Sequence, residues 1–507
     1  MGRRIAVPRR LRLVWKYGKA RILRMYFKRS RVVLVAAGCL AGLALAAVVF
    51  VALARQEDGG SAIRQSANVA ITIDTSKPVA PVPPRFTGLS FETSSLCSMQ
   101  KWYVQSTRFT QLLKNIGPTM IRIGGDTADK ALWDTDGTAA CSPAKTVVTP
   151  QLVHDTFTLA RAAHANVLWT ANLKGFAPAA AADEANYVVA AGGSDLYALG
   201  FGNEPDLYVR NHARPATYTI QSYMAEWNTY KKLTLAKQPK ARLMGNDGCC
   251  SLPWYTNFAA GEASSVSLLT RHYYPTNART GKGGRIPTTA NLLSRTLMQT
   301  TAADIHGWVA TASERHLPLR IDETNSASGG GARGMSDTFA SALWGLDYMF
   351  TALENGAAGM DFHEGESPAV YAPINEDLSA MPLYYAMLAF HYAAPNGYAV
   401  KDTMASQQPN IASHAVVKND GTLEVVIINK DLATPAKIAL TTNKAHTSAT
   451  VLRLTAPSVS STDDVTFGGS AIRGDGTWSS AQKPSAIHGK VTGITVAPVS
   501  AVVIELR

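Results

Sequence analysis

The chain has 507 residues, which is long enough for a large core and two folded domains, and its formal net charge is +12. The charge is local, because residues 1–31 hold 12 Lys and Arg and no acidic residue, while the remainder carries 37 basic and 37 acidic residues. This balance argues against a nucleic-acid-binding surface on the rest of the chain. If the protein bound nucleic acid, its salt-sensitive affinity would have to come from residues 1–31 alone.

Residues 32–54 form an uncharged, apolar segment directly after the basic tail. A membrane-spanning helix needs about 20 such residues, and flanking Lys and Arg favour the cytoplasmic side. We therefore expect a cytoplasmic tail (1–31), a transmembrane signal-anchor (32–54) and a catalytic region in the periplasm or outside the cell. The alternative is a signal peptide cleaved near Ala54, which would give a secreted protein.

Residues 55–84 are interpreted as a linker that contains one short alternating strand, 69–74. Four cysteines lie beyond the apolar segment: Cys97, Cys141, Cys249 and Cys250. An exported protein can form disulfides from them, but four cysteines allow three pairings and the sequence does not choose among these. Their spacing has no zinc signature, and we expect no metal.

Residues 85–394 alternate between apolar strands and amphipathic helices. The predicted strands are 86–92, 120–125, 166–173, 196–201, 241–246, 266–274, 319–323 and 359–363. Eight such alternations indicate a (β/α)8 TIM barrel, whose active site lies at the carboxyl ends of the strands. The alternative is an open doubly wound sheet, but its Gly-rich phosphate loop is missing after the first strand, which ends in Ser90-Phe91-Glu92.

Residues 395–507 lose the helical periodicity and show short alternating runs separated by turns such as Asn419-Asp420-Gly421. This pattern is typical of an all-β sandwich. Strand 69–74 precedes the barrel without a helix of its own, so we expect it to join the sandwich.

Two predicted strands end in a glutamate. Glu204 follows strand 196–201, and Pro205 biases it towards an extended conformation. Glu323 ends strand 319–323, so the two glutamates occupy the fourth and seventh strand positions and face each other across the barrel mouth. Retaining glycosidases use two carboxyl groups about 5–5.5 Å apart, one protonated and one ionised. The pair therefore predicts a retaining glycoside hydrolase.

Several motifs together make the chain resemble glycoside hydrolase family 79, which includes β-glucuronidases and heparanases. These motifs are 88–92, 122–125, 202–205, 272–274, 322–325 and 329–331, followed by the trailing β-sandwich. The resemblance implies a double-displacement mechanism without a cofactor, with Glu204 as acid/base and Glu323 as nucleophile. It also implies that Asn203 binds the sugar 2-OH and that Tyr273 donates to Glu323.

The resemblance further implies a set of substrate-binding positions. Glu92 and Asp126 would bind sugar hydroxyls, while the loop glycines Gly329 and Gly330 would offer backbone N–H groups to a uronate carboxylate. His363, Gly365 and Tyr371 would lie near the same carboxylate.

One position departs from the family pattern, since relatives carry a Tyr where this chain has Ser328. Glu364 and Glu366 on the strand-eight loop also add negative charge, which disfavours an anionic sugar. We expect a monomeric β-glucuronidase that acts on terminal β-linked glucuronic acid of a glycan or glycoside. The alternatives are a retaining exo-glycosidase for a neutral sugar and a non-catalytic carbohydrate-binding barrel.

Overall fold

The computed structural model describes residues 66–99, 104–142, 145–280, 285–365, 369–405, 409–483, 485–486 and 492–507. The predicted tail (1–31) and signal-anchor (32–54) lie outside these residues, as does the linker up to residue 65. Among the described residues, no helix is both long and apolar enough to cross a membrane. From Arg64 onward the chain forms one compact unit.

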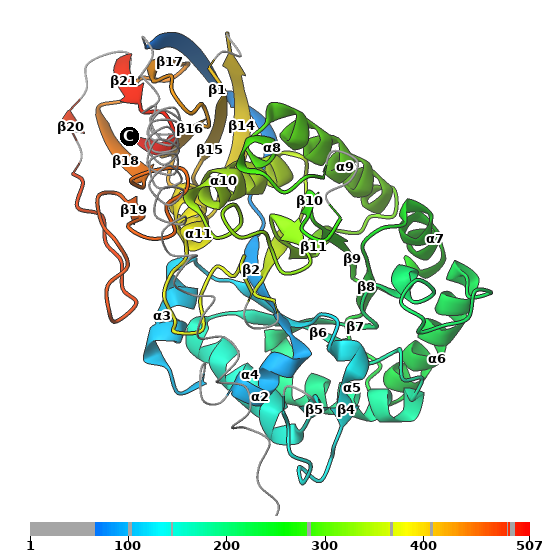
Figure 1. Cartoon of the computed structure of the whole chain (residues 1–507). Helices are drawn as coiled ribbons and strands as arrows, with labels where there is room; N and C mark the ends of the chain where they lie inside the picture. Colours follow the sequence, from blue (N-terminus) through cyan, green and yellow to red (C-terminus); the bar gives the residue numbers. More distant parts are fainter. Residues whose placement is uncertain are drawn as a thin grey trace, which may run out of the picture. The chain divides into compact units, whose positions relative to one another are not determined.

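All eight predicted barrel strands are present and parallel (Figure 1). They are β2 (Thr87–Glu92), β3 (Met120–Gly124), β6 (Asn166–Ala171), β7 (Leu196–Phe201), β8 (Met244–Gly248), β9 (Leu268–Tyr273), β11 (Leu319–Thr324) and β13 (Gly359–His363). The sheet order is β7-β6-β3-β2-β13-β11-β9-β8, and a parallel bridge between Leu199 and Leu243 joins its two ends. The sheet is therefore a closed barrel, and the open doubly wound alternative is excluded.

Helices cover the outside of the barrel. The longer ones are α3 (Thr107–Asn115), α4 (Pro150–Ala163), α5 (Pro178–Gly192), α6 (Ile220–Lys237), α7 (Leu252–Glu262), α9 (Arg295–Ser313), α10 (Phe339–Glu354) and α11 (Pro382–Ala393). Their starts follow local chemistry: α4, for example, begins with Pro150 after Thr149, whose hydroxyl accepts from the Leu152 N–H. Helix α10 is buried from Phe339 to Leu353, because it lies between the barrel and the C-terminal sheet.

The C-terminal region is all β. Its main strands are β14 (Tyr398–Met404), β15 (Ile411–Val417), β16 (Leu423–Asn429), β17 (Ala436–Thr442), β18 (Ser448–Thr455), β21 (Thr492–Val496) and β22 (Ser500–Leu506). Strand β1 (Ala67–Pro81) pairs with β14 in antiparallel and with β17 in parallel orientation. The prediction that the strand before the barrel joins this domain is confirmed.

Side chains on the C-terminal strands alternate between two cores. In β16, Val426 and Ile428 belong to the large core that includes the barrel, whereas Val425 and Ile427 belong to a second core within the β domain. Because successive strand residues point to opposite faces, one face of the sheet covers the barrel and the other closes the sandwich.

A buried charged cluster lies where the β domain meets α10. The Asp347 carboxylate of α10 is 3.0 Å from Nε2 of His414 in β15 and 2.5 Å from Nζ of Lys430. The other nitrogen of His414 lies 2.8 Å from Glu354. This cluster joins two elements that are distant in the sequence.

Candidate active site

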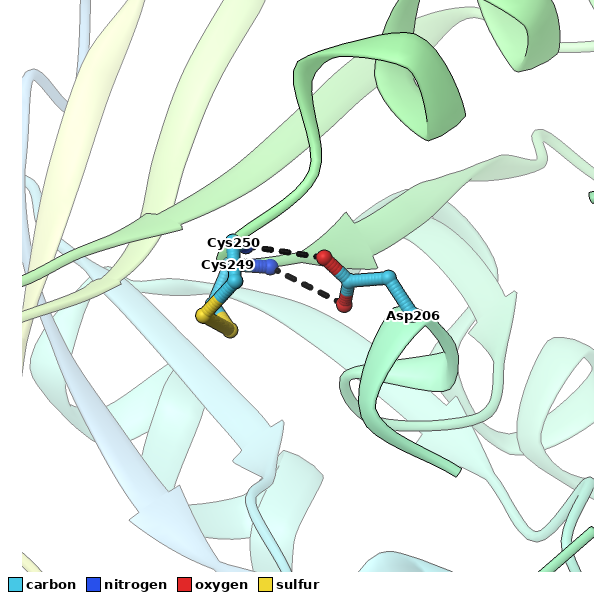
Figure 2. Close-up of side chains that lie close together, drawn as sticks. All are labelled: Asp206, Cys249 and Cys250. Atoms are coloured by element: carbon cyan, nitrogen blue, oxygen red, sulfur yellow. Dashed lines mark hydrogen bonds between the residues drawn. A yellow bond between two sulfur atoms is a disulfide. The ribbon is translucent and has the colours of Figure 1, made fainter. Parts of the chain in front are cut away.

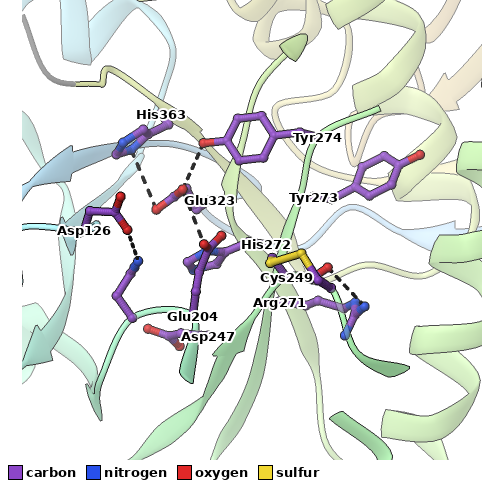
Figure 3. Close-up of polar contacts among 12 residues, drawn as sticks. Asp126, Glu204, Asp247, Cys249, Arg271, His272, Tyr273, Tyr274, Glu323 and His363 are labelled. Atoms are coloured by element: carbon purple, nitrogen blue, oxygen red, sulfur yellow. Dashed lines mark hydrogen bonds and ion pairs between the residues drawn. A yellow bond between two sulfur atoms is a disulfide. The ribbon is translucent and has the colours of Figure 1, made fainter. Parts of the chain in front are cut away.

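The barrel brings the two predicted carboxylates together at the mouth (Figure 3). Glu204 follows β7, and Glu323 is the penultimate residue of β11. One oxygen of each carboxylate and one nitrogen of His272 all lie within 4.8 Å of one another. The two carboxyl groups are therefore close enough to act on the same sugar.

The backbone at Glu204 differs from the extended conformation that Pro205 suggested. Glu204 has φ 48° and ψ 53°, in the left-handed region. The residue before a proline avoids the right-handed helical region, and here a backbone hydrogen bond of 2.9 Å from Glu204 N–H to the Asp247 carbonyl accompanies the left-handed conformation. The carboxyl group is therefore held over the barrel mouth by a tertiary contact with β8.

Glu323 lies in an environment that favours its ionised form. Burial alone would raise the pKa of the Glu323 carboxyl, but the charges of His363 and Arg122 and a hydrogen bond from Tyr274 hold that pKa well below its usual range. Arg122 donates to Oε2 at 2.7 Å and Tyr274 donates to Oε1 at 2.9 Å. Glu323 is therefore a carboxylate at neutral pH, as a nucleophile must be.

Glu204 lies in an environment with the opposite effect. Burial and the negative charge of Glu323 raise the pKa of the Glu204 carboxyl, against the hydrogen bond from His272. The side chain is 18% exposed, so it can reach a ligand in the mouth. The pKa values of the two glutamates thus shift in opposite directions, as expected when one is a general acid and the other a nucleophile.

Arg122 of β3 is the residue that sequence reasoning missed, since it was noted in a motif but given no role. It is fully buried, with Nη1 on Glu323 and on Ser90, and its Nε lies 3.1 Å from Asp322. Its Nη2 donates to the Asn203 amide oxygen at 2.9 Å. The available signal was a charged residue within an apolar strand, because a buried charge must be paired.

His272 is the second residue that was missed. Its Nδ1 lies 3.1 Å from Oε1 of Glu204, and its Nε2 lies 3.1 Å from Nη2 of Arg122. Despite burial, the charge of Glu323 and the hydrogen bond to Glu204 raise the pKa of His272 to about 9, so Nδ1 carries a proton and donates it to Glu204. Arg122 lies against the other nitrogen of the histidine that orients the predicted acid.

The predicted role of Tyr273 is wrong by one residue. Its hydroxyl lies 2.9 Å from that of Thr301, on the outer side of the barrel, and Figure 3 shows the ring pointing away from the two glutamates. Tyr274 donates to Glu323 instead. Strand side chains alternate between the two faces of a sheet, so an error of one position exchanges inside and outside.

Asn203 and Asp126 lie at the rim of the mouth, next to the glutamates. The amide nitrogen of Asn203 is 3.4 Å from Asp126, its oxygen accepts from Arg122, and its backbone N–H donates to Asp129. The Asn203 side chain is thus held in one orientation, and Asp126 is exposed. Both remain predicted sugar-binding residues.

Glu92 is buried and already occupied by protein donors. It accepts from the N–H and the hydroxyl of Thr127, at 2.8 and 2.5 Å, and one oxygen lies 3.4 Å from Nε2 of His363. Nδ1 of His363 is in turn 3.1 Å from the Ser90 hydroxyl. Glu92 therefore holds His363 near Glu323, and a direct contact of Glu92 with sugar stays a prediction.

The predicted uronate-binding segments lie on two loops above β11 and β13. Ser328 belongs to the short strand β12 (Ala327–Ser328), which pairs with β10 (Thr276–Asn277). Gly329 and Gly330 have φ of 84° and 89°, a region that favours glycine. A Cβ on Gly365 would lie only 3.0 Å from the Tyr371 ring, so the two loops and this tyrosine are closely packed.

Glu364 lies in an environment that disfavours the negative charge that the sequence suggested. Its side chain is buried, and burial raises the pKa of the Glu364 carboxyl well above its usual range. Burial therefore disfavours the charged form of Glu364 and weakens its repulsion of an anionic sugar. Glu366 lies outside the described residues.

Two groups at the mouth have the spacing of metal ligands: Glu204, His272 and Glu323 form one, and Asp247, His272 and Asp322 form the other. The Arg122 guanidinium contacts Glu323, Asp247 and Asp322, and so already supplies a positive charge to both groups. The donor set thus fits an arginine-centred network better than a cation site.

The structure also resolves the cysteine pairing that the sequence left open. Cys97 is bonded to Cys141, and Cys249 is bonded to its neighbour Cys250. The second pair lies on the loop after β8, at the carboxyl end of the barrel.

The chain is similar to several known proteins. Residues 413–503 match the family model described as the glycosyl hydrolase family 79 C-terminal beta domain. A beta-glucuronidase of Neurospora crassa is 24% identical over 422 residues, covering 71% of this chain and 74% of that protein. A beta-glucuronidase of Aspergillus niger is 25% identical over 194 residues, covering 34% of this chain and 35% of that protein.

Solved structures share the fold. A 4-O-alpha-L-rhamnosyl-beta-D-glucuronidase from Fusarium oxysporum superposes with a TM-score of 0.73 at 20% identity, covering 85% of this chain and 99% of that one. An arabinofuranosidase gives a TM-score of 0.65 at 15% identity, over 87% and 100% of the two chains. The barrel and β domain therefore form a fold that is common to several glycosidases.

Proposed function

We propose that this glycoside hydrolase, which carries the C-terminal β domain of family 79, is a retaining β-glucuronidase that removes terminal β-linked glucuronic acid. The observation that carries the proposal is the pair of carboxyl groups, Glu204 and Glu323, with oxygens within 4.8 Å and pKa values displaced in opposite directions. Retaining enzymes hold the two carboxyl groups about 5–5.5 Å apart and inverting enzymes about 6.5–9.5 Å apart, and the close approach of the two oxygens here favours the retaining arrangement.

In the first step, the Glu323 carboxylate attacks the anomeric carbon while Glu204 gives its proton to the departing glycosidic oxygen. In the second, the Glu204 carboxylate takes a proton from water, and the water releases glucuronic acid from Glu323. Arg122 and Tyr274 keep Glu323 ionised before attack, and His272 orients Glu204. Asn203, fixed by Arg122, offers its amide nitrogen to the 2-OH.

Three observations support a uronate over a neutral sugar. The curated relatives are beta-glucuronidases by name. Burial disfavours the negative charge of Glu364 by raising the pKa of its carboxyl. Arg279 also packs against Gly329, where a Cβ would lie 3.0 Å from the Arg279 Nε, so a positive charge adjoins the predicted carboxylate-binding loop. Ser328, in place of the family tyrosine, favours a neutral sugar, as does the acidic Glu366, which lies outside the described residues.

The mechanism is tested with an aryl β-D-glucuronide and the variants Glu204→Gln and Glu323→Gln. We expect each variant to lower kcat by about a thousandfold, which is the scale of a lost acid–base or nucleophilic group. Azide added to Glu323→Gly should give an α-glycosyl azide, because azide attacks from the face that the nucleophile has left. Equal turnover by wild type and both variants would refute the assignment.

The sugar is tested separately, with aryl β-glycosides that differ only at C6: a carboxylate, a hydroxymethyl group or hydrogen. We expect the carboxylate to give the highest kcat/KM, and Arg279→Ala to reduce that preference without affecting the hydroxymethyl substrate. A preference for the hydroxymethyl compound would establish the neutral-sugar alternative instead.

A further inference from the structure

The bonded neighbours Cys249 and Cys250 form an uncharged surface at the carboxyl end of the barrel (Figure 2). They follow β8, the strand between β7, which leads to Glu204, and β9, which carries His272. Cys250 is exposed and Cys249 is partly exposed, so solvent reaches the pair. The mechanism described above does not use it.

Asp206 holds this turn in place. Its carboxylate accepts from the backbone N–H groups of Cys249, Cys250 and Ser251, at 3.3, 2.8 and 2.8 Å. These three donors occupy the carboxylate, and the two sulfur atoms point away from it in Figure 2. Asp206 therefore positions the disulfide, and the sulfur face is left without a polar partner of its own in this turn.

The turn is close to the predicted acid. The Glu204 N–H donates to the carbonyl of Asp247, only two residues before Cys249, and two residues span at most about 7 Å. Asp206, which binds the turn, is itself two residues after Glu204. A general acid must lie beside the oxygen of the leaving group, so the leaving group is on the Glu204 side of the mouth.

We propose that the Cys249–Cys250 disulfide is part of the subsite that binds the leaving group (the aglycone) and that it contacts a ring of this leaving group. The proposal rests on the function proposed above. A disulfide offers polarisable sulfur and no charge, which suits an aromatic ring or the apolar face of a sugar ring. The turn thereby contributes to the choice of leaving group and leaves recognition of glucuronic acid to the other side of the mouth.

The test compares two substrates that need no proton from Glu204: 2,4-dinitrophenyl β-D-glucuronide, whose leaving group is a ring, and β-D-glucuronyl fluoride, whose leaving group is not. For Cys249→Ala/Cys250→Ala we expect kcat/KM to fall about five- to tenfold with the dinitrophenyl substrate. The value for the fluoride should stay within about twofold, because the glucuronic acid and the bond to Glu323 are the same.

The matched control removes the other disulfide, with Cys97→Ala/Cys141→Ala, and should leave the ratio of the two kcat/KM values unchanged. If Cys249→Ala/Cys250→Ala does not fold, dithiothreitol can be applied to the control variant instead. It then reduces Cys249–Cys250, the one remaining disulfide among the described residues, and kcat/KM should fall with the dinitrophenyl substrate but not with the fluoride. An unchanged ratio, including an equal loss with both substrates, overturns this inference but leaves the proposed glucuronidase function standing. Wild type that is inactive towards both overturns the glucuronidase assignment as well.

Discussion

The Tyr274 hydroxyl donates to Oε1 of Glu323 at 2.9 Å, while Arg122 donates to Oε2 of the same carboxylate at 2.7 Å. Each carboxylate oxygen therefore has its own donor, one from the middle of β3 and the other from the residue that follows β9. This arrangement fixes the orientation of Glu323 and stabilises its charge without covering it, since the side chain stays 8% exposed.

Replacing Tyr274 with Phe should reduce kcat/KM by about 10- to 100-fold, because a hydrogen bond to a charged group contributes about 1.5–3 kcal/mol. It should also raise the pKa of Glu323 and move the acidic limb of the pH–rate profile to higher pH. The matched control is Tyr273→Phe, whose hydroxyl contacts Thr301, and which should keep wild-type activity. Equal losses in the two variants would contradict the assignment.

The pH dependence of kcat/KM should be bell-shaped. Glu323 must be ionised, and its pKa lies well below the usual range, so activity falls only in strong acid. Glu204 must be protonated, and its pKa is raised above 4.5, so activity falls as pH rises through that raised value. The alkaline limb should appear with a phenyl leaving group, which needs the proton, and should be absent with a 2,4-dinitrophenyl group, which does not. An alkaline limb in the residual activity of Glu204→Gln towards the phenyl substrate would assign the acid to another residue.

Arg122 should be required for both folding and activity. Its replacement by Met leaves the carboxyl groups of Asp247, Asp322 and Glu323 without their shared cation, and removing one partner of a buried charged pair costs about 3–5 kcal/mol. Denaturant unfolding measures the loss. Arg122→Lys should restore part of the stability but little activity, because an ammonium group cannot contact Ser90, Asn203 and Glu323 in the same geometry.

The buried His414 should make stability depend on pH at the contact between the barrel and the β domain. Glu354 and Asp347 raise the pKa of His414 to about 10 despite its burial, against about 6.5 in the unfolded chain. Its stabilising effect is thus complete below about pH 6.5 and lost as pH rises to about 10. His414→Gln should lower the free energy of unfolding by about 3 kcal/mol at pH 6, and by less at pH 9.

The matched control for this measurement is His154→Gln on the exposed side of α4. It should change the free energy of unfolding little at either pH, as is usual for exposed positions. If the loss of unfolding free energy caused by His414→Gln is as large at pH 9 as at pH 6, the positive charge on His414 in this cluster is contradicted.

Local patterns determined most of the architecture. Apolar runs of five to nine residues, alternating with amphipathic helices, were enough to predict every barrel strand, and counting these strands placed Glu204 and Glu323 at the fourth and seventh. The change to alternating runs after Pro395 was enough to predict the β domain. These features are predictable because strand and helix periodicity arise between residues that are close in the sequence.

Contacts between distant segments decided the chemistry of the site. Arg122 acquires its role only when β3, β9 and β11 close around it, and the choice between Tyr273 and Tyr274 depends on which of two adjacent side chains points inward. The left-handed backbone conformation of Glu204 accompanies a hydrogen bond to Asp247 in β8. The pairing of Cys249 with Cys250 depends on the turn that Asp206 holds. The sequence alone thus determined the frame and the two glutamates, whereas their protonation and orientation come from charges and hydrogen bonds that only the closed barrel assembles.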